Sequence, residues 1–487
     1  MGSNRNITQV AVIGAGISGV LTAAYLKNAG VHVTVFERAK VAGGVWVYDE
    51  RVPIDPTYPA IKPSKGEAYE EFDAKGKSDL RELLHAPPSP VYYGLKNNIA
   101  TSLMQTKQLG WPDGTLDFVT HAVFKNYIQE ISSKTGVQSL TKYGARVSAV
   151  KKEGLKWSLT YTVLGKDLNE PSQQYELFFD AVIVAAGHYH CPRVPDIPGL
   201  TTWKAKWPSR IWHSKAYRKP DQFKGKNILL IGAGTSSTDI ARELHPVANK
   251  IYQSSRNSKY DFPIGMLPPN ATRIAEIASF DLAGLEDAND ETFPATITLK
   301  SGEKLCDIHN IIICTGYTIT FSYLNSYHND DLKPTEADDT ILVTDGSQVH
   351  NLHKDIWYIP DPSLAFVGIP YFTANFSLFE FQAIAVAAVL SGAAILPAEE
   401  VMRKEYAEKV ALKGVGRSFH SLRGEEVQYV NELLEWINTD PTRSPAEKIE
   451  GHTALWHQAN EAQNVRIREA FDPTNNWHTG FPLTSCL

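Results

Sequence analysis

Residues 9–19 read Gln9-Val-Ala-Val-Ile13-Gly14-Ala-Gly16-Ile-Ser18-Gly19, and they decide the fold of the first part of the chain. The apolar run Gln9–Ile13 predicts a buried strand, and a helical pattern begins after the glycines. The first glycine permits a tight turn, the second lets the backbone approach a diphosphate, and the third allows close helix–strand packing. The helix N-terminus then faces the phosphates. We therefore expect Gly14, Gly16, Ser18 and Gly19 to bind a dinucleotide.

An acidic residue specifies which dinucleotide this first site accepts. The strand predicted at Val31–Phe36 ends at Glu37, which follows Gly19 by 18 residues, close to the roughly 20 expected of a ribose-binding acid. A carboxylate accepts a hydrogen bond from a 2′-hydroxyl and repels a 2′-phosphate. The first site is thus predicted to hold FAD or NAD, with Glu37 and its neighbour Arg38 as contacts.

A second glycine-rich stretch has a different ending. The predicted strand Asn227–Ile231 leads into Gly232-Ala-Gly234-Thr235-Ser236-Ser237, and the next strand, Lys250–Gln253, is followed by Ser254-Ser255-Arg256 instead of an acid. Hydroxyls and a guanidinium suit a 2′-phosphate, because charge-assisted bidentate bonds form there. The second site is therefore predicted to hold NADPH. The alternative is that Arg256 is a solvated surface charge. The predicted contacts are Gly232, Gly234, Thr235, Ser236, Ser237, Ser254, Ser255 and Arg256.

Composition argues against several other classes of protein. The 487 residues include 48 basic and 54 acidic side chains, a net charge of −6 without a basic block, so no nucleic-acid partner is expected. The four cysteines form no Cys-x-x-Cys pair, which speaks against a zinc site or a dithiol relay, and no metal site is predicted. The apolar stretch Phe381–Pro397 is shorter than the ~20 residues of a membrane span. We expect a buried core helix there, no transmembrane anchor, and a cytoplasmic location.

Two further strand–glycine junctions indicate how the domains are arranged. The run Asp180–Ala185 meets Gly187, and the run Asp307–Ile313 meets Gly316. Glycines at such crossings fit a backbone that passes close to a cofactor, so Gly187 is another expected contact. The simplest topology is an α/β fold with two Rossmann-like domains, the smaller inserted into the larger. We expect FAD-binding parts at residues 1–204 and 321–487, the latter with C-terminal helices, and an NADPH-binding domain at 205–320.

Just before the second glycine loop the chain resembles the flavin-containing monooxygenases. That family shows Phe-x-Gly-x-x-x-His-x-x-x-Tyr, and this chain shows Trp207-Pro-Ser209-Arg-Ile-Trp-His213-Ser-Lys-Ala-Tyr217. His213 and Tyr217 match, whereas Trp207 and Ser209 depart. Baeyer–Villiger monooxygenases usually carry Trp where Tyr217 stands. We expect His213 to brace the interdomain linker and not to transfer protons.

The resemblance also implies individual site residues. Gly43-Gly44-Val45-Trp46 is similar to the family's Gly-Gly-x-Trp, where the backbone wraps the flavin nucleotide. In Tyr93-Gly-Leu-Lys-Asn97-Asn98 the match to the family's flavin-facing asparagine is Asn98, the implied catalytic residue, with Asn97 as the alternative if the register slips by one. An ordinary loop asparagine is the other interpretation. The remaining implied FAD contacts are Val147 and Gln382.

The activity implied by the resemblance divides the work between two cofactors. NADPH gives hydride to FAD, O2 forms a C4a-hydroperoxyflavin, and a soft nitrogen or sulfur of a small-molecule amine or sulfide is oxygenated. The alternatives are Baeyer–Villiger oxygenation of a ketone, a non-catalytic flavin redox sensor, and a disulfide reductase, against which the missing dithiol speaks. A homo-oligomer remains open. The proline-rich residues 52–91 are either a lid over the flavin or a surface excursion.

Overall fold

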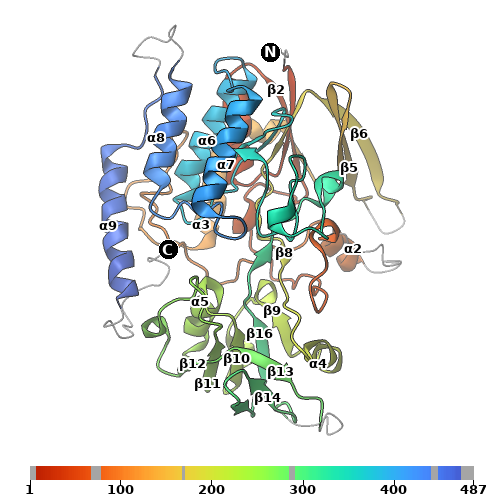
Figure 1. Cartoon of the computed structure of the whole chain (residues 1–487), viewed down its shortest axis with the longest axis vertical. Helices are drawn as coiled ribbons and strands as arrows, with labels where there is room; N and C mark the ends of the chain where they lie inside the picture. Colours follow the sequence, from red (N-terminus) through yellow and green to blue (C-terminus); the bar gives the residue numbers. More distant parts are fainter. Residues whose placement is uncertain (1–6, 67–77, 167–169, 284–290, 440–447, 473–487) are drawn as a thin grey trace.

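The computed structural model describes residues 7–66, 78–166, 170–283, 291–439 and 448–472. Two sheets organise it: the first is mixed, with an antiparallel edge at β18-β19-β20, and the second is parallel throughout. Figure 1 shows a larger part that contains both ends of the described chain and a smaller part below it, built from the middle of the sequence. The first sheet has the strand order β18-β19-β20-β7-β1-β2-β3, and the second β12-β11-β10-β16-β9.

The first sheet is centred on β1 (Gln9–Ile13), as its apolar run predicts. Parallel neighbours β2 (His32–Glu37) and β7 (Ala181–Val184) flank it. Parallel strands covered on both faces are apolar throughout, and β7 is fully buried. The sheet is completed by β3 (Thr141–Tyr143), β20 (Leu364–Phe366), β19 (Trp357–Tyr358) and β18 (Leu352–His353).

Helices cover one face of this sheet and a small antiparallel sheet covers the other. On the helical face, α1 (Ile17–Asn28) packs along α6 (Asn375–Leu390), with α3 (His121–Lys134) beside them. Almost every residue of α6 is buried, so the core helix predicted at Phe381–Pro397 is present, although it begins and ends earlier. The antiparallel sheet consists of β4 (Ala145–Glu153), β5 (Lys156–Val163) and β6 (Gln173–Phe179).

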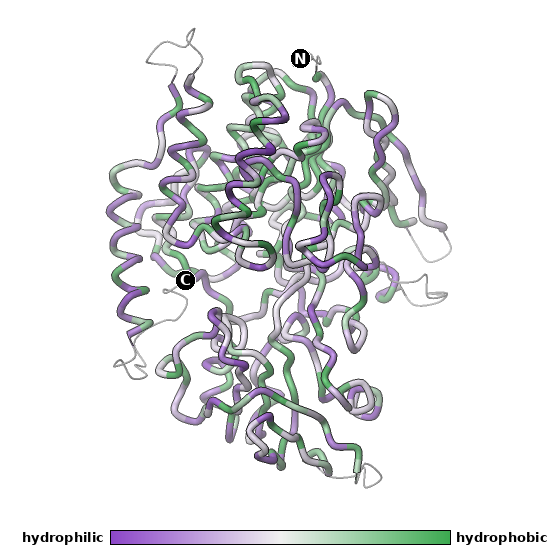
Figure 2. The backbone as a smooth tube through the Cα atoms, in the orientation of Figure 1, coloured by the Kyte–Doolittle hydropathy of each residue, from purple (hydrophilic) through white to green (hydrophobic). Residues whose placement is uncertain are grey.

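The remaining helices of this part lie on its outside. They are α2 (Ser78–His85), α7 (Glu399–Lys413), α8 (Glu426–Ile437) and α9 (Ala454–Phe471). In Figure 2 the backbone of α7 and α9 is mostly hydrophilic, whereas the hydrophobic stretches gather between the layers. None of the helices in the described ranges combines the length and the apolar character needed to cross a membrane.

The second sheet is built only from residues between 211 and 313. Its central strand β10 (Asn227–Ile231) lies between β11 (Lys250–Ser254) and β16 (Asn310–Ile313), and all neighbours are parallel. The other strands and helices of this part are β9 (Ile211–His213), β12 (Ala271–Ile274), β13 (Ile277–Phe280), β14 (Ile297–Leu299), β15 (Lys304–Leu305), α4 (Leu200–Lys206) and α5 (Thr235–Leu244).

The chain enters and leaves the smaller part through two paired segments. The chain enters through β8 (Cys191–Pro192) and the residues beside it, called the entry crossing. It leaves through β17 (Tyr317–Thr318) and the residues beside it, called the exit crossing. The two strands run antiparallel to each other. The predicted fold class is therefore confirmed: two Rossmann-like units, the smaller inserted into the larger. The limits at residues 204/205 and 320/321 stay a prediction.

Candidate active site

One cavity of about 1470 Å³ joins the two glycine loops. Its walls include the carboxyl ends of the central parallel strands in both sheets, which is where open α/β sheets bind ligands. Four predicted site residues, Gly19, Ser237, Ser255 and Gln382, are absent from its lining. Those that line it are Gly14, Gly16, Ser18, Glu37, Arg38, Gly44, Val45, Trp46, Asn98, Val147, Gly187, Gly232, Gly234, Thr235, Ser236, Ser254 and Arg256.

The first glycine loop has no room for side chains at its ends. Gly14 has a φ of +104°, and a Cβ there would stand 2.6 Å from the carbonyl oxygen of Ala185 at the end of β7. At Gly19 a Cβ would lie 1.9 Å from the Gly14 carbonyl oxygen. Helix α1 therefore approaches the loop as closely as a diphosphate cradle requires, and the loop fits a dinucleotide.

The second loop repeats this geometry with one difference. Gly232 has a φ of +112°, and its Cβ would lie 2.6 Å from the carbonyl oxygen of Cys314 at the end of β16. Ser237 takes the place of the third glycine and is fully buried. Its hydroxyl donates to the Gly234 carbonyl at 3.0 Å and accepts from the Gln253 amide at 2.8 Å. Serine fits at this position because its hydroxyl is bonded to the Gly234 carbonyl and the Gln253 amide at the start of α5. It therefore does not need to face the cavity.

Glu37 binds protein backbone as well as lining the cavity. Its Oε2 accepts from the Ala15 N–H at 2.7 Å and its Oε1 from the Ala39 N–H at 2.8 Å. Burial raises the pKa of this carboxyl, while the two N–H groups and Arg38 oppose the rise. Each carboxylate oxygen has a second lone pair, so both remain able to accept from a ribose hydroxyl.

The Gly-Gly-x-Trp segment forms a short turn against the same loop. Gly44–Trp46 is a single 3₁₀ turn, and the Trp46 ring stacks on Phe124 of α3 at 4.4 Å between centroids. Val45 is exposed to the cavity. The tryptophan therefore anchors the turn in the core while the backbone and Val45 face the nucleotide site.

The residues after β11 divide between the cavity and their own loop. Arg256 is exposed on the cavity wall. The hydroxyl of Ser254 donates to the Ala275 carbonyl at 3.0 Å, and that of Ser255 donates to Asp261 at 2.5 Å. Ser255 is thus turned toward its own loop, so of the two serines only Ser254 lines the cavity.

Two further arginines, which no sequence motif predicted, reach this region. Arg193 lies in the entry crossing, where its N–H donates to the Gly316 carbonyl at 2.9 Å. Arg417 comes from the segment between α7 and α8, and its guanidinium lies 4.8 Å from the centre of the Tyr260 ring. Both line the cavity, and the pKa of Arg193 is lowered by burial and by the nearby charges of Arg417 and Arg256. The two arginines are far apart in the sequence and come together only in the folded chain. No local sequence pattern therefore identifies them.

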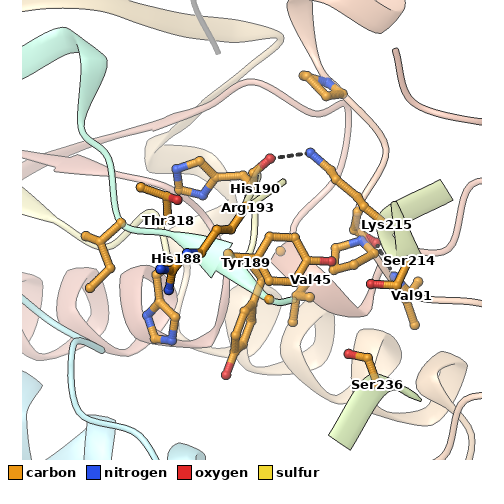
Figure 3. A pocket seen from close by; sticks show the side chains of 18 of the residues that line it. Val45, Val91, His188, Tyr189, His190, Arg193, Ser214, Lys215, Ser236 and Thr318 are labelled. Carbon is orange, nitrogen blue, oxygen red and sulfur yellow. Dashed lines mark hydrogen bonds between the residues drawn. The ribbon is translucent and has the colours of Figure 1, made fainter. Parts of the chain in front are cut away.

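The close-up in Figure 3 shows how the entry crossing is held at the cavity. The Lys215 ammonium donates to the main-chain carbonyl of His190 at 2.5 Å. His213 is buried, its Nδ1 accepts from the Lys215 N–H at 3.1 Å, and its Nε2 lies 3.0 Å from the Gly316 carbonyl. Burial lowers the pKa of His213 to about 3, so the neutral ring donates through Nε2. It links the segment after β9 to the Gly316 backbone before β17, which agrees with the bracing role expected from the sequence.

The structure distinguishes the two adjacent asparagines. Asn97 is buried, its amide donates to the carbonyls of Ile99 and Asp117, both at 2.7 Å, and its oxygen accepts from the Val119 N–H at 2.6 Å. Asn98 lines the cavity, and within the described ranges its side-chain amide has no hydrogen-bond partner. The amide of Asn97 is committed to its loop, whereas that of Asn98 is free for a ligand.

Gln382 supports the cavity wall from behind. It is fully buried in α6, its Oε1 accepts from the Gly368 N–H at 3.0 Å, and its Nε2 donates to the Tyr429 hydroxyl at 2.8 Å. Gly368 is part of the lining. The side chain of Gln382 therefore positions the backbone that faces the cavity.

A carboxylate pair on α5 connects the second loop to the Asn98 segment. Asp239 lines the cavity and accepts a hydrogen bond from the Tyr92 hydroxyl, and Glu243, one turn later, accepts from Tyr217 at 2.7 Å. Burial and then the neighbouring Glu243 raise the pKa of Asp239 to about 7. Tyr92 comes from the segment that precedes Asn98 and Tyr217 from the linker at residues 207–217, so this pair ties three segments together.

Part of the proline-rich segment 52–91 lines the cavity. Residues 67–77 lie outside the described residues, but Pro87, Pro88, Pro90 and Val91 line the cavity. The segment is fastened by Arg146, which donates to the Leu84 carbonyl, and by Lys204, which pairs with Asp55. Its described residues therefore contribute to the cavity wall and are attached to both parts of the molecule.

Two Rossmann-like sites that open on one cavity define the class of this protein: an oxidoreductase with two dinucleotide cofactors. A family model described as flavin-binding monooxygenase-like matches residues 79–262 and 289–445, and one for an NAD(P)-binding Rossmann-like domain matches residues 12–60. The chain is 48% identical to flavin-containing monooxygenase ustF2 of Aspergillus flavus, over 96% of this chain and 99% of that protein. It is 29% identical to flavin-containing monooxygenase iboF of Amanita muscaria, over 89% and 88% of the two chains.

The fold is also shared with solved structures. S-allyl-L-cysteine S-oxygenase from Allium sativum superposes with a TM-score of 0.69 at 24% identity, over 96% of each chain. Cyclohexanone monooxygenase superposes with a TM-score of 0.55 at 13% identity, over 88% of this chain and 97% of that one. The chain belongs to the flavin-binding monooxygenase family. It is an enzyme that uses FAD and NADPH, which confirms the cofactors expected from the two glycine loops.

Proposed function

We propose that this monooxygenase oxygenates a soft nucleophilic nitrogen or sulfur of a small molecule. Two observations favour a heteroatom over a ketone carbon. Tyr217 keeps the residue typical of heteroatom-oxygenating relatives, and its hydroxyl bond to Glu243 shows that it is integrated into the linker. The structure from Allium sativum, which is named as an S-oxygenase, superposes with a higher TM-score than that of cyclohexanone monooxygenase. Family membership in turn favours catalysis over the redox-sensor alternative.

The residues around the two loops divide between the cofactors. FAD is assigned to the loop of Gly14 and Gly16, to Glu37, and to the turn at Gly44–Trp46; NADPH is assigned to the loop of Gly232 and Gly234 and to Arg256. Arg193 and Arg417 add positive charge beside the second loop, which suits a ligand that carries several phosphate charges. The limits of the NADPH-binding domain at residues 205 and 320 stay part of this proposal.

The chain's own contribution is to orient the cofactors, exclude water and supply a hydrogen-bond donor. When bound, NADPH supplies a hydride and the reduced flavin supplies the group that reacts with O2. The Asn98 amide can donate to the reacting oxygen without acting as a base. Apolar walls at Val45, Ile99 and Phe376 keep water away from it, which limits the loss of reducing equivalents as peroxide.

The observation that carries this proposal is the shared cavity, which both nucleotide loops and Asn98 line. The test is oxygen uptake with NADPH across a panel of amines, sulfides and ketones, with hydrogen peroxide measured in parallel. One oxygenated amine or sulfide product per NADPH is the expected result. Turnover of ketones alone would favour the Baeyer–Villiger alternative, and complete conversion of NADPH to peroxide with every compound would leave a simple oxidase.

Arg256 provides a separate test of the NADPH site. Arg256→Ala should raise the KM for NADPH roughly tenfold or more, the effect of losing a hydrogen bond to a charged group, and should leave the KM for NADH almost unchanged. Lys259→Ala is the matched control, since Lys259 is exposed nearby but lies outside the cavity lining. Equal effects of Arg256→Ala on the two cofactors would remove its role at the 2′-phosphate.

A further inference from the structure

The segment that carries Asn98 has no regular structure of its own. After the isolated bridge between Lys96 and Thr120, residues 97–119 form turns and loop. Helices hold the middle of this loop: the Thr106 N–H donates to Tyr127 of α3 at 3.0 Å, and the Lys107 N–H donates to Glu380 of α6 at 2.7 Å. The position of Asn98 therefore depends on contacts made to its loop from elsewhere.

Helix α9 supplies contacts to both ends of this loop. Trp456 donates to the Leu103 carbonyl at 3.2 Å, Gln463 donates to the Asn98 carbonyl at 3.4 Å, and Arg466 pairs with Asp117 at 3.3 Å. The three side chains are seven and three residues apart, so they share one face of the helix. Trp456 and Gln463 are the buried residues of α9. Of the two, Gln463 is the polar one, and its amide reaches the Asn98 carbonyl.

We propose that Gln463 is a positioning residue that sets the direction of the Asn98 amide through the Asn98 main chain. Within the described ranges, Gln463 makes the one hydrogen bond found at any atom of Asn98. The neighbouring Asn97 cannot replace it, because its amide is bonded within the loop. The proposal rests on the proposed function, in which the Asn98 amide faces the reacting oxygen.

The physical consequence of losing this contact is a rotation of the Asn98 peptide. A displacement of about 1 Å in a group that faces a reacting centre can change a rate by as much as roughly 100-fold. Hydride transfer is assigned to NADPH at the second glycine loop, so the rotation of the Asn98 peptide should leave it unchanged. The expected signature is therefore selective: flavin reduction stays normal, while more of the reducing equivalents leave as hydrogen peroxide.

The test compares Gln463→Met with Gln458→Met in the full-length enzyme loaded with FAD. Methionine keeps the size of glutamine without its donor, and Gln458 lies on the exposed side of the same helix. Gln463→Met should raise the rate of NADPH-dependent peroxide release without substrate at least threefold, with anaerobic flavin reduction by NADPH within twofold of wild type. Gln458→Met should change neither rate. An unchanged rate of peroxide release in FAD-loaded Gln463→Met would overturn the proposal.

A double-mutant cycle separates this proposal from the proposed function. If Gln463 acts through Asn98, Gln463→Met should add nothing to peroxide release in an Asn98→Ala background; additive effects would assign Gln463 a purely structural role. If Asn98→Ala alone left peroxide release and turnover at wild-type values, the role of Asn98 itself would fail.

Arg466→Met, which removes the more exposed contact to the same loop, should raise peroxide release by a smaller factor than Gln463→Met. No rise would count against α9 as the positioning element.

Discussion

At the scale of single residues, the Glu37 side chain bonds to backbone while it lines the cavity. The Glu37 carboxylate receives the N–H groups of Ala15 and Ala39 from two different loops. Asn97 and Asn98 are adjacent in sequence, yet one bonds its own loop and the other faces the cavity. The residue type does not tell which asparagine bonds the loop and which faces the cavity, because both are asparagines. The hydrogen-bond partners that the fold places around each side chain decide it.

Glu37→Gln should weaken FAD binding and lower the free energy of unfolding by about 1–3 kcal/mol. A glutamine amide presents one oxygen and one NH2 group, so one of the two loop N–H groups loses its acceptor. The flavin content of the purified protein and its thermal unfolding would measure both effects. Glu408→Gln, on the exposed face of α7, is the control and should change neither. A normal flavin content in Glu37→Gln would contradict the assigned role.

Asp239→Asn should change how stability depends on pH. The pKa of Asp239 is about 7 in the folded protein against an ordinary value of 3.8. Between these two pH values the folded state holds a proton that the unfolded state has released, so the wild-type protein loses stability as the pH rises through this window. Asparagine still accepts from Tyr92 but does not titrate. The variant should therefore gain, relative to wild type, on the order of 4 kcal/mol between pH 4 and pH 8, and parallel curves from denaturant unfolding would contradict this.

At the scale of elements, the two strand–loop–helix units differ at the third position of the loop. Gly19→Ala should abolish FAD binding, because the new Cβ would stand 1.9 Å from the Gly14 carbonyl oxygen and would push α1 away from the loop. Ser237→Ala should only cost about 1–2 kcal/mol, from its lost hydroxyl bonds, and should leave the KM for NADPH within twofold. Flavin absorbance and steady-state kinetics would measure these outcomes. A yellow, active Gly19→Ala enzyme would show that the first loop can move further than its packing indicates.

At the scale of the whole molecule, Arg218 joins the two parts. Its buried guanidinium donates to the carbonyls of Lys215 and Tyr217 in the linker, both at 2.9 Å, and to those of Arg51 at 3.1 Å and Ser89 at 3.3 Å in the cavity wall. The planar fork of arginine reaches all four carbonyls, and a lysine ammonium cannot.

Arg218→Lys should therefore lower the free energy of unfolding by about 2–4 kcal/mol, since several buried carbonyls lose their donor. It should also increase peroxide release, because the two nucleotide loops are no longer held in one arrangement. Arg468→Lys on the exposed side of α9 is the matched control. Thermal unfolding and peroxide assays of both variants would decide, and equal stability of the two would count against Arg218 as the connection.

The sequence by itself was sufficient for the features that depend on neighbouring residues. The strand at Gln9–Ile13, both glycine turns, the acid at Glu37 and the buried helix near Phe381 follow from apolar runs, backbone freedom and spacing, which act within about thirty residues. The assignment of the two cofactors rested on the same local chemistry. Tertiary structure alone decided which groups meet across long stretches of chain. It placed Arg193 beside Arg417, turned Ser255 away from the cavity, and separated Asn98 from Asn97. It also brought Gln463 to a loop 365 residues earlier in the chain. Hydrogen bonds and charges act over a few ångströms of space, and only the folded chain brings such distant residues within that range.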